Sequence, residues 1–390
     1  MGDREPLQGQ LVFAPGEGMV YGPGSARAEL ARLLRRVGSQ RPFLVTTGSV
    51  VSSGLADEVA AMIGPDLVGR FAGSKEHTPG PVVLAGAAEA RAAGADALVA
   101  LGGSSVVDLA KGIALVLAEG EDLDQLRLRP GADGRVHRPA LTEPKIPQIA
   151  LPTTLSGAEF TGAAGITNLD VGEKQLFMAP GLAPRWIVMD PELARSCPAR
   201  LWAGTGMKAL ADTIEVQCSR RANPLSDAVA AAALAILAAE LPAATADPDD
   251  LDARGRCQFA VAMALGQLAS VGVGLVAGLR HQLGGGLGVA HGEASTIVLP
   301  HVIGFNADAA AAPLARAARA VGLDTADDLA RFVTELAAGL GLPTRLRDVG
   351  VSPDDLDGVA RHVLGDASVR TNPRPVRDAA EVRAVLDAAW

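Results

Sequence analysis

Apolar positions in the first half of the chain form short continuous runs, separated by longer stretches with helical spacing. A short continuous apolar run is typical of a strand buried on both faces, whereas apolar residues three and four apart indicate an amphipathic helix. Strands are predicted at residues 43–47, 67–71, 97–101 and 148–151, with helices between them at 51–63, 81–93 and 105–117. Helical crossovers of this length join parallel strands, so the pattern predicts a doubly wound parallel sheet.

The pattern changes near residue 192, because helical spacing dominates from Leu193 onward. Helices are predicted, for instance, at residues 309–321, 325–337 and 354–364, with breaks at 223–224, 242–250 and 284–288. Residues 119–145 are rich in charge, glycine and proline, and we expect a surface excursion there. A chain of 390 residues is long enough for two domains. We expect an α/β domain over residues 1–192 and an all-helical domain over residues 193–390.

Composition narrows the choice of partners and compartment. The net charge of −9 argues against nucleic acid or an anionic membrane as the main partner. The alanine-rich run at residues 228–241 is short, so it predicts a buried helix rather than a membrane span. The first ten residues are charged, so a secretory signal is not expected. Cys197, Cys218 and Cys257 lack metal-ligand spacing and indicate the reduced, buried thiols of a cytoplasmic protein.

Two turns rich in glycine and hydroxyl groups follow the third and fourth predicted strands. The first turn opens a helix and contains Gly102, Gly103, Ser104 and Ser105. Glycine lets the backbone approach a ligand, and the first amides of the helix suit a pyrophosphate. A plain tight turn explains this segment equally well on its own. The second turn, with Thr153 and Thr154, lies at the same edge of the sheet, and the two together favour a dinucleotide site.

The segment from Gly102 to Lys111 resembles the Gly-Gly-Gly-Ser-x-x-Asp-x-x-Lys motif of iron-containing alcohol dehydrogenases. Residues 152–154 resemble the next motif of that family. Residues 71–79, with His77, and residues 154–161, with Glu159, are similar to motifs of its maleylacetate reductase branch, although Ala158 stands where that branch has serine. The resemblance continues through residues 190–193, 206–210, 278–284, 291–292 and 299–301, so it covers most of the chain.

This resemblance implies a Rossmann-like N-terminal α/β domain, an all-helical C-terminal domain and an active site between them, the dehydroquinate synthase-like fold of that family. It also implies a homodimer and a bound NAD or NADP. The strand that ends at Thr47 carries no acidic residue for a ribose diol, and Thr47 and Gly48 leave room for a 2′-phosphate. Either cofactor is therefore expected. The implied cofactor-binding residues are Thr47, Gly102, Gly103, Ser104, Ser105, Asp108, Lys111, Thr153 and Thr154.

The metal site of the family is altered in this sequence. Metal-dependent members hold iron or zinc with an Asp and a His four residues apart, a His on a later helix and a His before a glycine. Transferred by motif, these positions are Lys208, Asp212, Ala277 and His291. An ammonium and a methyl group cannot ligate a metal, and a divalent ion needs three or four protein ligands. We therefore expect no bound metal.

In place of the metal, Lys208 is expected to pair with Asp212 and to polarise a substrate carbonyl or bind a carboxylate. An ordinary surface pair four residues apart is the alternative. His281 is predicted to be the proton donor, because histidine titrates near neutral pH, against the alternative of a structural role. His77 is left open between contact with substrate or cofactor and a structural role. Structural roles are expected for His137, His301 and His362.

The leading hypothesis is metal-independent, NAD(P)H-dependent reduction of a small carbonyl or α,β-unsaturated oxo-acid, similar to the maleylacetate reductase reaction. The catalytic residues would be Lys208, Asp212, His281 and His291, and a small anionic substrate would contact His77, Ser156, Glu159 and Arg280. Two alternatives stay open. One is a non-redox lyase, cyclase or isomerase that uses Lys208 as a base or Schiff-base amine, together with His281, and the other is a non-catalytic relative.

Overall fold

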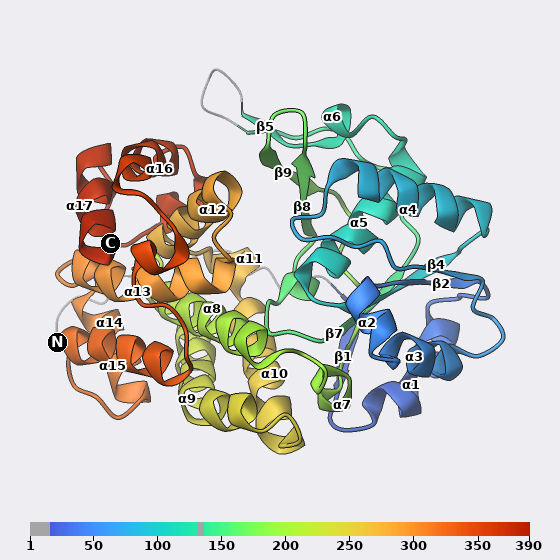
Figure 1. Ribbon diagram of the computed structural model, residues 1–390, viewed down its shortest axis with the longest axis horizontal. Helices are drawn as coiled ribbons and strands as arrows, with labels where there is room; N and C mark the ends of the chain where they lie inside the picture. The colour runs from blue at the N-terminus through green and yellow to red at the C-terminus, as the bar shows by residue number, and fades with distance from the viewer. Residues whose placement is uncertain (1–15, 131–135) are drawn as a thin grey trace.

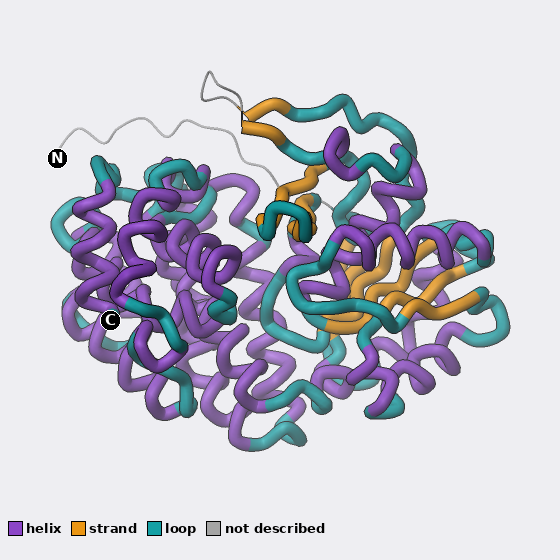
Figure 2. Tube along the Cα trace, turned by 45° about the horizontal axis from the view of Figure 1, so that its top comes forward, coloured by secondary structure: helices purple, strands orange, loops and turns teal. Residues whose placement is uncertain are grey.

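The computed structural model describes residues 16–130 and 136–390. Figure 1 shows a sheet covered by helices beside a second part built from helices. The last strand ends at Met189, and every described element after it is helical. Figure 2 shows the same separation, with the strands of the main sheet gathered on one side of the molecule.

Six parallel strands form the main sheet, and four of them are the strands that the short apolar runs predict. The six strands are β1 (Gly18–Tyr21), β2 (Pro42–Val45), β3 (Gly69–Phe71), β4 (Ala97–Gly102), β7 (Gln148–Pro152) and β10 (Trp186–Met189), in the spatial order β1-β10-β7-β4-β2-β3. From β2 the chain passes to β3 on one side and then to β4 on the other. The topological switch point, where open α/β sheets bind ligands, therefore lies between the carboxyl ends of β2 and β4.

Helices cover both faces of this sheet. On one face α1 (Ser25–Arg36) and α3 (Leu55–Ile63) pack against Leu44 and Val99. On the other face α4 (Gly80–Ala92) and α5 (Ser104–Glu119) pack against Phe43 and Leu98. Neighbouring residues of a strand point to opposite faces, so strands that are apolar at every position bury side chains in both layers.

The α/β part departs from the sequence prediction at several places. The helix expected at residues 51–63 is two helices, α2 (Gly48–Ser52) and α3, because Gly54 takes a left-handed conformation with φ of 84°. The excursion after α5 contains α6 (Leu123–Leu126) and two short paired strands, β5 (Arg129–Pro130) and β6 (Val136–His137). The elements that were not predicted are β1, α1, β10, the short 3₁₀ turn η1 (Ala158–Phe160) and an antiparallel hairpin of β8 (Ala163–Asn168) and β9 (Glu173–Met178).

The helical part surrounds two central helices, α8 (Ala199–Cys218) and α13 (His291–Asn306), which pack against each other and share one apolar core. Around them lie α7 (Pro191–Ala194), α9 (Pro224–Ala246), α10 (Leu251–Leu265), α11 (Leu268–Val271), α12 (Leu275–Leu287), α14 (Ala311–Ala320), α15 (Ala326–Gly339), α16 (Leu356–Val363) and α17 (Ala379–Ala389), with the 3₁₀ turns η2 (Leu346–Val349), η3 (Pro353–Asp355) and η4 (Ala367–Thr371).

Helix α9 corrects one prediction and agrees with another. The break expected from residue 242 is wrong, because α9 continues through Pro242 to Ala246, where buried Leu241 and Ala244 pack into the core. Among the described residues α9 is the one helix long and apolar enough to cross a membrane. It packs instead against α8 and α10 through a buried face, as expected for residues 228–241.

Candidate active site

The turn after β4 lies at the switch point of the sheet. Gly102 has a φ of 152°, and a β-carbon there would lie 2.6 Å from Cγ2 of Val106. A β-carbon on Gly103 would lie 3.1 Å from Cγ2 of Thr154, which belongs to the second turn. The amide of Thr153 donates a hydrogen bond of 3.0 Å to the carbonyl of Gly102. The two turns therefore touch, and they meet at the start of a 16-residue helix whose dipole and amides suit a phosphate.

Thr47 lies on the other side of the switch point, at the end of β2. Its hydroxyl caps α2 by accepting a hydrogen bond of 3.2 Å from the amide of Val50, and it contacts the Ser49 hydroxyl at 2.8 Å. The structure thus brings Thr47 to the same edge as Gly102 and Gly103, as the sequence predicts for a cofactor-binding residue.

Lys111 and Asp108 lie behind the turns rather than at their surface. The Lys111 ammonium is fully buried and donates hydrogen bonds of 2.7 Å to the carbonyls of Ala158 and Ala163. Asp108 lies 3.7 Å from that ammonium and accepts a hydrogen bond of 3.2 Å from the amide of Gly165. The prediction of a direct cofactor contact is therefore corrected for this pair, because both charges are used to tie η1 and β8 to α5.

Two cations share one buried carboxylate in the helical part of the site. Asp212 of α8 contacts the Lys208 ammonium at 2.6 Å and the Arg280 guanidinium of α12 at 3.1 Å. Lys208 also donates a hydrogen bond of 2.9 Å to the carbonyl of Ser156 in the second turn, and Arg280 donates one of 3.2 Å to the hydroxyl of Ser295. The cluster therefore joins the helical part to the turns of the α/β part.

The charges in this cluster stabilise one another. Burial favours the neutral acid, but the Lys208 and Arg280 charges hold the pKa of Asp212 below its ordinary value. Burial lowers the pKa of Lys208, and the Asp212 carboxylate opposes this shift. The Lys208 side chain is 15% exposed whereas that of Asp212 is fully buried, so the cluster presents the ammonium, and not the carboxylate, to a ligand. The alternative of a surface ion pair is therefore wrong.

The residues at the family's metal position do not fit a metal ion. The only ligand-type group on α8 at this position, Asp212, is bound by two cations, and Ala277 on α12 offers a methyl group. Within residues 16–130 and 136–390 there is no group of three or more His, Cys, Asp or Glu side chains that could hold a metal. Because a divalent ion needs at least three protein ligands, this arrangement does not supply a binding site.

Three histidines gather beside the cluster. The ring of His291, at the start of α13, lies 6.4 Å from the ring of His77 and 6.3 Å from that of His281, measured between centroids. Burial, and then the positive charges of Arg280 and Lys174, lower the pKa of His291 to about 2. At physiological pH His291 is therefore a neutral imidazole, which is a much weaker acid than an imidazolium.

His281 and His77 are held in different ways. The Nδ1 of His281 lies 2.9 Å from a carboxylate oxygen of Asp366, and the His281 side chain is 43% exposed. His77 has a φ of 60°, which is uncommon for a residue with a side chain, and its carbonyl accepts a hydrogen bond of 2.7 Å from Thr167 of β8. The hairpin thus fixes a turn that directs His77 toward His291.

Glu159 and Ser156 were both predicted to contact substrate, and the structure places only Ser156 at the site. Ser156 lies at the site, with its carbonyl bound to Lys208 and its hydroxyl 3.1 Å from that of Thr154. Glu159 is fully buried, and neither carboxyl oxygen has a hydrogen-bond partner among the described residues. Its prediction as a substrate contact is corrected, because Glu159 is enclosed by protein, and the positive charges that act on it are those of Lys111 and Lys208.

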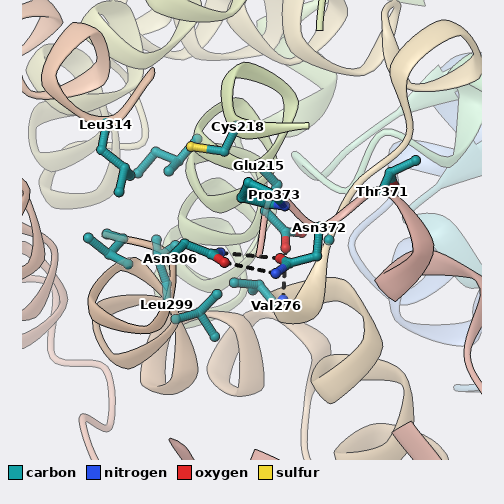
Figure 3. A pocket seen from close by; sticks show the side chains of 13 residues that line it. Glu215, Cys218, Val276, Leu299, Asn306, Leu314, Thr371, Asn372 and Pro373 are labelled. Carbon is teal, nitrogen blue, oxygen red and sulfur yellow. Dashed lines mark hydrogen bonds between the residues drawn. The ribbon is translucent and has the colours of Figure 1, made fainter. Parts of the chain in front are cut away.

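Glu215, which the sequence analysis missed, positions the helix that carries Arg280 and His281. Its carboxylate accepts hydrogen bonds of 2.8 Å and 3.2 Å from the amides of Val276 and Ala277 at the start of α12. Figure 3 shows Glu215 beside a small pocket with Asn306 and Asn372, which has room for about one water molecule. Burial raises the pKa of Glu215 to about 7.

Sequence reasoning also missed Asp366, Ser295 and Lys174. Asp366 lies 85 residues from His281 and Ser295 lies 15 residues from Arg280, spacings that match no helical or strand repeat. Glu215 could have been found, since it lies on the Asp212 side of α8, three residues further along the helix.

The parallel sheet has two turns suited to phosphate at its switch point, and a charged site on the helical part lies beside them. This combination is that of a nucleotide-dependent dehydrogenase of two domains. The chain belongs to the iron-containing alcohol dehydrogenase family. The model described as "Iron-containing alcohol dehydrogenase" matches residues 17–191, and the one described as "Fe-containing alcohol dehydrogenase family, C-terminal" matches residues 202–390. The protein is an NAD(P)-dependent oxidoreductase, and the predicted fold and family are confirmed.

Two relatives and one solved structure show the range of the likeness. The chain is 36% identical to a 4-hydroxybutyrate dehydrogenase of Cupriavidus necator, over 90% of this chain and 93% of that protein. It is 33% identical to a maleylacetate reductase of Sphingobium indicum, over 92% of each. The crystal structure of maleylacetate reductase from Agrobacterium tumefaciens matches with a TM-score of 0.81 and 30% identity, over 98% of this chain and 99% of that one.

Proposed function

We propose that this protein reduces a small carbonyl compound or an α,β-unsaturated oxo-acid with NADH or NADPH, and that it does so without a metal ion. The observation that carries the proposal is the Lys208–Asp212–Arg280 cluster. It places two cations where metal-dependent relatives are expected to hold a dication. Reduction of a carbonyl builds negative charge on oxygen, and fixed positive charges in a site shielded from water stabilise that charge.

Lys208 is the group that would polarise the substrate oxygen. An ammonium has three N–H donors, and the contacts with Ser156 and Asp212 use two of them. The third remains for a ligand. Arg280, held by Asp212 and Ser295, adds a second positive charge beside it. The same charges favour an acidic substrate, because they would also stabilise a carboxylate next to the reacting carbonyl.

His281 is the residue that we assign as proton donor. The Asp366 carboxylate orients its ring, and the 43% exposure of the side chain lets the ring exchange protons with water. His291 stays neutral, so its part is to shape the site and to accept or donate a hydrogen bond.

The turns at residues 102–105 and 153–154, with Thr47, would hold the dinucleotide. When bound, the nicotinamide supplies the hydride. The chain supplies a pyrophosphate cradle and a place for the ribose. Since Thr47 offers a hydroxyl and no carboxylate at this edge, we propose that both NADH and NADPH are accepted. A homodimer and a cytoplasmic location remain predictions, and the three buried thiols support the second of them.

The test measures turnover of small aldehydes and oxo-acids with NADH and NADPH, in the presence and absence of a chelator. Lys208→Met removes the ammonium with little change in volume, and we expect kcat/KM to fall at least 100-fold, the loss typical of one charge-stabilising donor. Lys145→Met is the matched control, because Lys145 also makes a buried ion pair, with Glu119, but lies outside the site. Near-normal turnover in Lys208→Met would refute the assignment, and product without oxidation of the reduced cofactor would favour the non-redox alternative.

A further inference from the structure

The β8–β9 hairpin lies at the border between the two parts of the molecule (Figure 1). On one side it is tied to the α/β part, because Asp108 binds the amide of Gly165 and Thr167 binds the carbonyl of His77. On the other side β9 contacts α12, the helix of Arg280 and His281. The hairpin therefore borders both the helix that carries Arg280 and His281 and the turn that carries His77.

Lys174 of β9 is such a side chain. It pairs with Thr167 in the hairpin register, and its chain extends diagonally across Gly165 of the neighbouring strand. A β-carbon on Gly165 would overlap the Lys174 ε-carbon and would lie 3.0 Å from its Nζ. Lys174 can take this path only because residue 165 has no side chain.

The position of Lys174 brings its charge to the histidine cluster. Lys174 is among the cations that act on His291, second only to Arg280. The hairpin geometry agrees, because Thr167, which pairs with Lys174, donates a hydrogen bond to the carbonyl of His77, whose ring lies 6.4 Å from that of His291. Lys174 therefore lies on the hairpin side of the histidine cluster, whereas Lys208 and Arg280 belong to the helices α8 and α12.

Lys174 differs from the other two cations in having no counter-charge. Lys208 and Arg280 share Asp212, so their two charges are partly compensated. Lys174 is exposed, and its ammonium makes no ion pair or hydrogen bond within the described ranges of the chain. An uncompensated ammonium beside a site is suited to bind an anion.

The geometry points to Lys174 as the residue that selects substrates with a negatively charged group at the end remote from the reacting carbonyl, a carboxylate being the simplest. This inference rests on the proposed function, because it assumes that the carbonyl lies at Lys208. The remote group then lies on the hairpin side of His291. The residue determines specificity rather than chemistry, so its loss acts on KM and not on kcat.

Two substrates of equal length separate charge recognition from every other effect. The terminal carboxylate of 4-oxobutanoate is absent from butanal, and the aldehyde is the same. In Lys174→Gln we expect KM for 4-oxobutanoate to rise about 10- to 100-fold, as for loss of a hydrogen bond to a charged group, with kcat within about threefold. The constants for butanal should stay unchanged.

Gly165→Ala tests the geometry without removing the charge. The added methyl group should push the flexible end of Lys174 aside, and the same selective rise in KM should appear in reduced size. Glu173→Gln is the control, since residue 173 lies on the same strand and points to the opposite face. It should leave both substrates unaffected. Equal losses for 4-oxobutanoate and butanal in Lys174→Gln, or no loss for either, would overturn the inference.

A binding measurement keeps the inference separate from the proposed function. Succinate, which cannot be reduced, is titrated into the complex with NAD⁺ by calorimetry. We expect its Kd to rise about 10- to 100-fold in Lys174→Gln while the Kd of NADH stays constant. If the wild-type protein reduces no aldehyde or oxo-acid, the proposed function fails, and the succinate Kd still tests Lys174. An unchanged succinate Kd, or a weakened NADH Kd, would overturn the role of Lys174.

Discussion

Replacing Glu159 by glutamine should make the protein more stable at alkaline pH and leave it unchanged at acidic pH. Glu159 is fully buried, and neither of its oxygens has a hydrogen-bond partner among the described residues. Burial raises its pKa from 4.5 to about 7, although the positive charges of Lys111 and Lys208 act in the opposite direction. Glutamine has nearly the same shape and carries no charge at any pH.

The size of the effect follows from the two pKa values. The folded protein binds the Glu159 proton more tightly than the unfolded chain, so this proton stabilises the fold fully below pH 4.5. The contribution is lost as the pH rises, and it is gone once the pH passes about 7. A difference between 4.5 and about 7 corresponds to roughly 3 kcal/mol of unfolding free energy. Glu159→Gln should escape this loss, and above pH 7 it should exceed the wild type by up to that amount.

Thermal unfolding of both proteins between pH 4.5 and pH 8.5 measures the effect. For a cooperative unit of 150–250 residues, 3 kcal/mol corresponds to a midpoint shift of roughly 6–12 °C. Glu215 also has a raised pKa, but it is present in both proteins and cancels in the difference. Parallel curves for the two proteins, or a less stable variant at pH 8, would show that the Lys111 and Lys208 charges outweigh burial and that the reasoning is wrong.

Two further predictions concern the ligands of the site. Gly103→Val should weaken NADH binding at least tenfold in a fluorescence titration. The fold should stay intact, because Gly103 has an ordinary φ of −84° and only the Thr154 side chain must move. An unchanged affinity would place the pyrophosphate elsewhere. The purified protein should contain far less than one iron or zinc per chain by elemental analysis, and turnover should survive a chelator. The reason is that Asp212 is already bound by two cations. One tightly bound ion per chain would contradict this prediction.

The central part of the fold could be predicted because its signals are local. The strands at residues 97–102 and 148–152 are continuous apolar runs that end in turns, and both lie within one residue of the predicted bounds. The hairpin of β8 and β9 gave no such signal. Its strands mix apolar, polar and glycine residues, and they gain their order from contacts with α5 and His77 rather than from their own pattern.

The sequence could predict which residues belong to the candidate site, but not all the contacts that they make with one another. The spacing of Lys208 and Asp212 placed them on one helical face, and they do pair. Arg280 completes the cluster because α12 crosses α8, and this contact joins residues 68 positions apart in the chain. Burial was the other unknown. Lys111 and Glu159 match a binding motif, yet both are enclosed by neighbours that only the packed structure reveals.

The burial of all three cysteines makes the chain convenient for site-specific labelling. Cys197, Cys218 and Cys257 are buried, and burial raises the pKa of each thiol to about 12. The thiolate is the form that reacts with maleimides and with oxidants, so the native protein should be inert to both at neutral pH. A single cysteine introduced at an exposed position such as Leu169, at the end of β8, would then carry a fluorophore without removal of any native thiol.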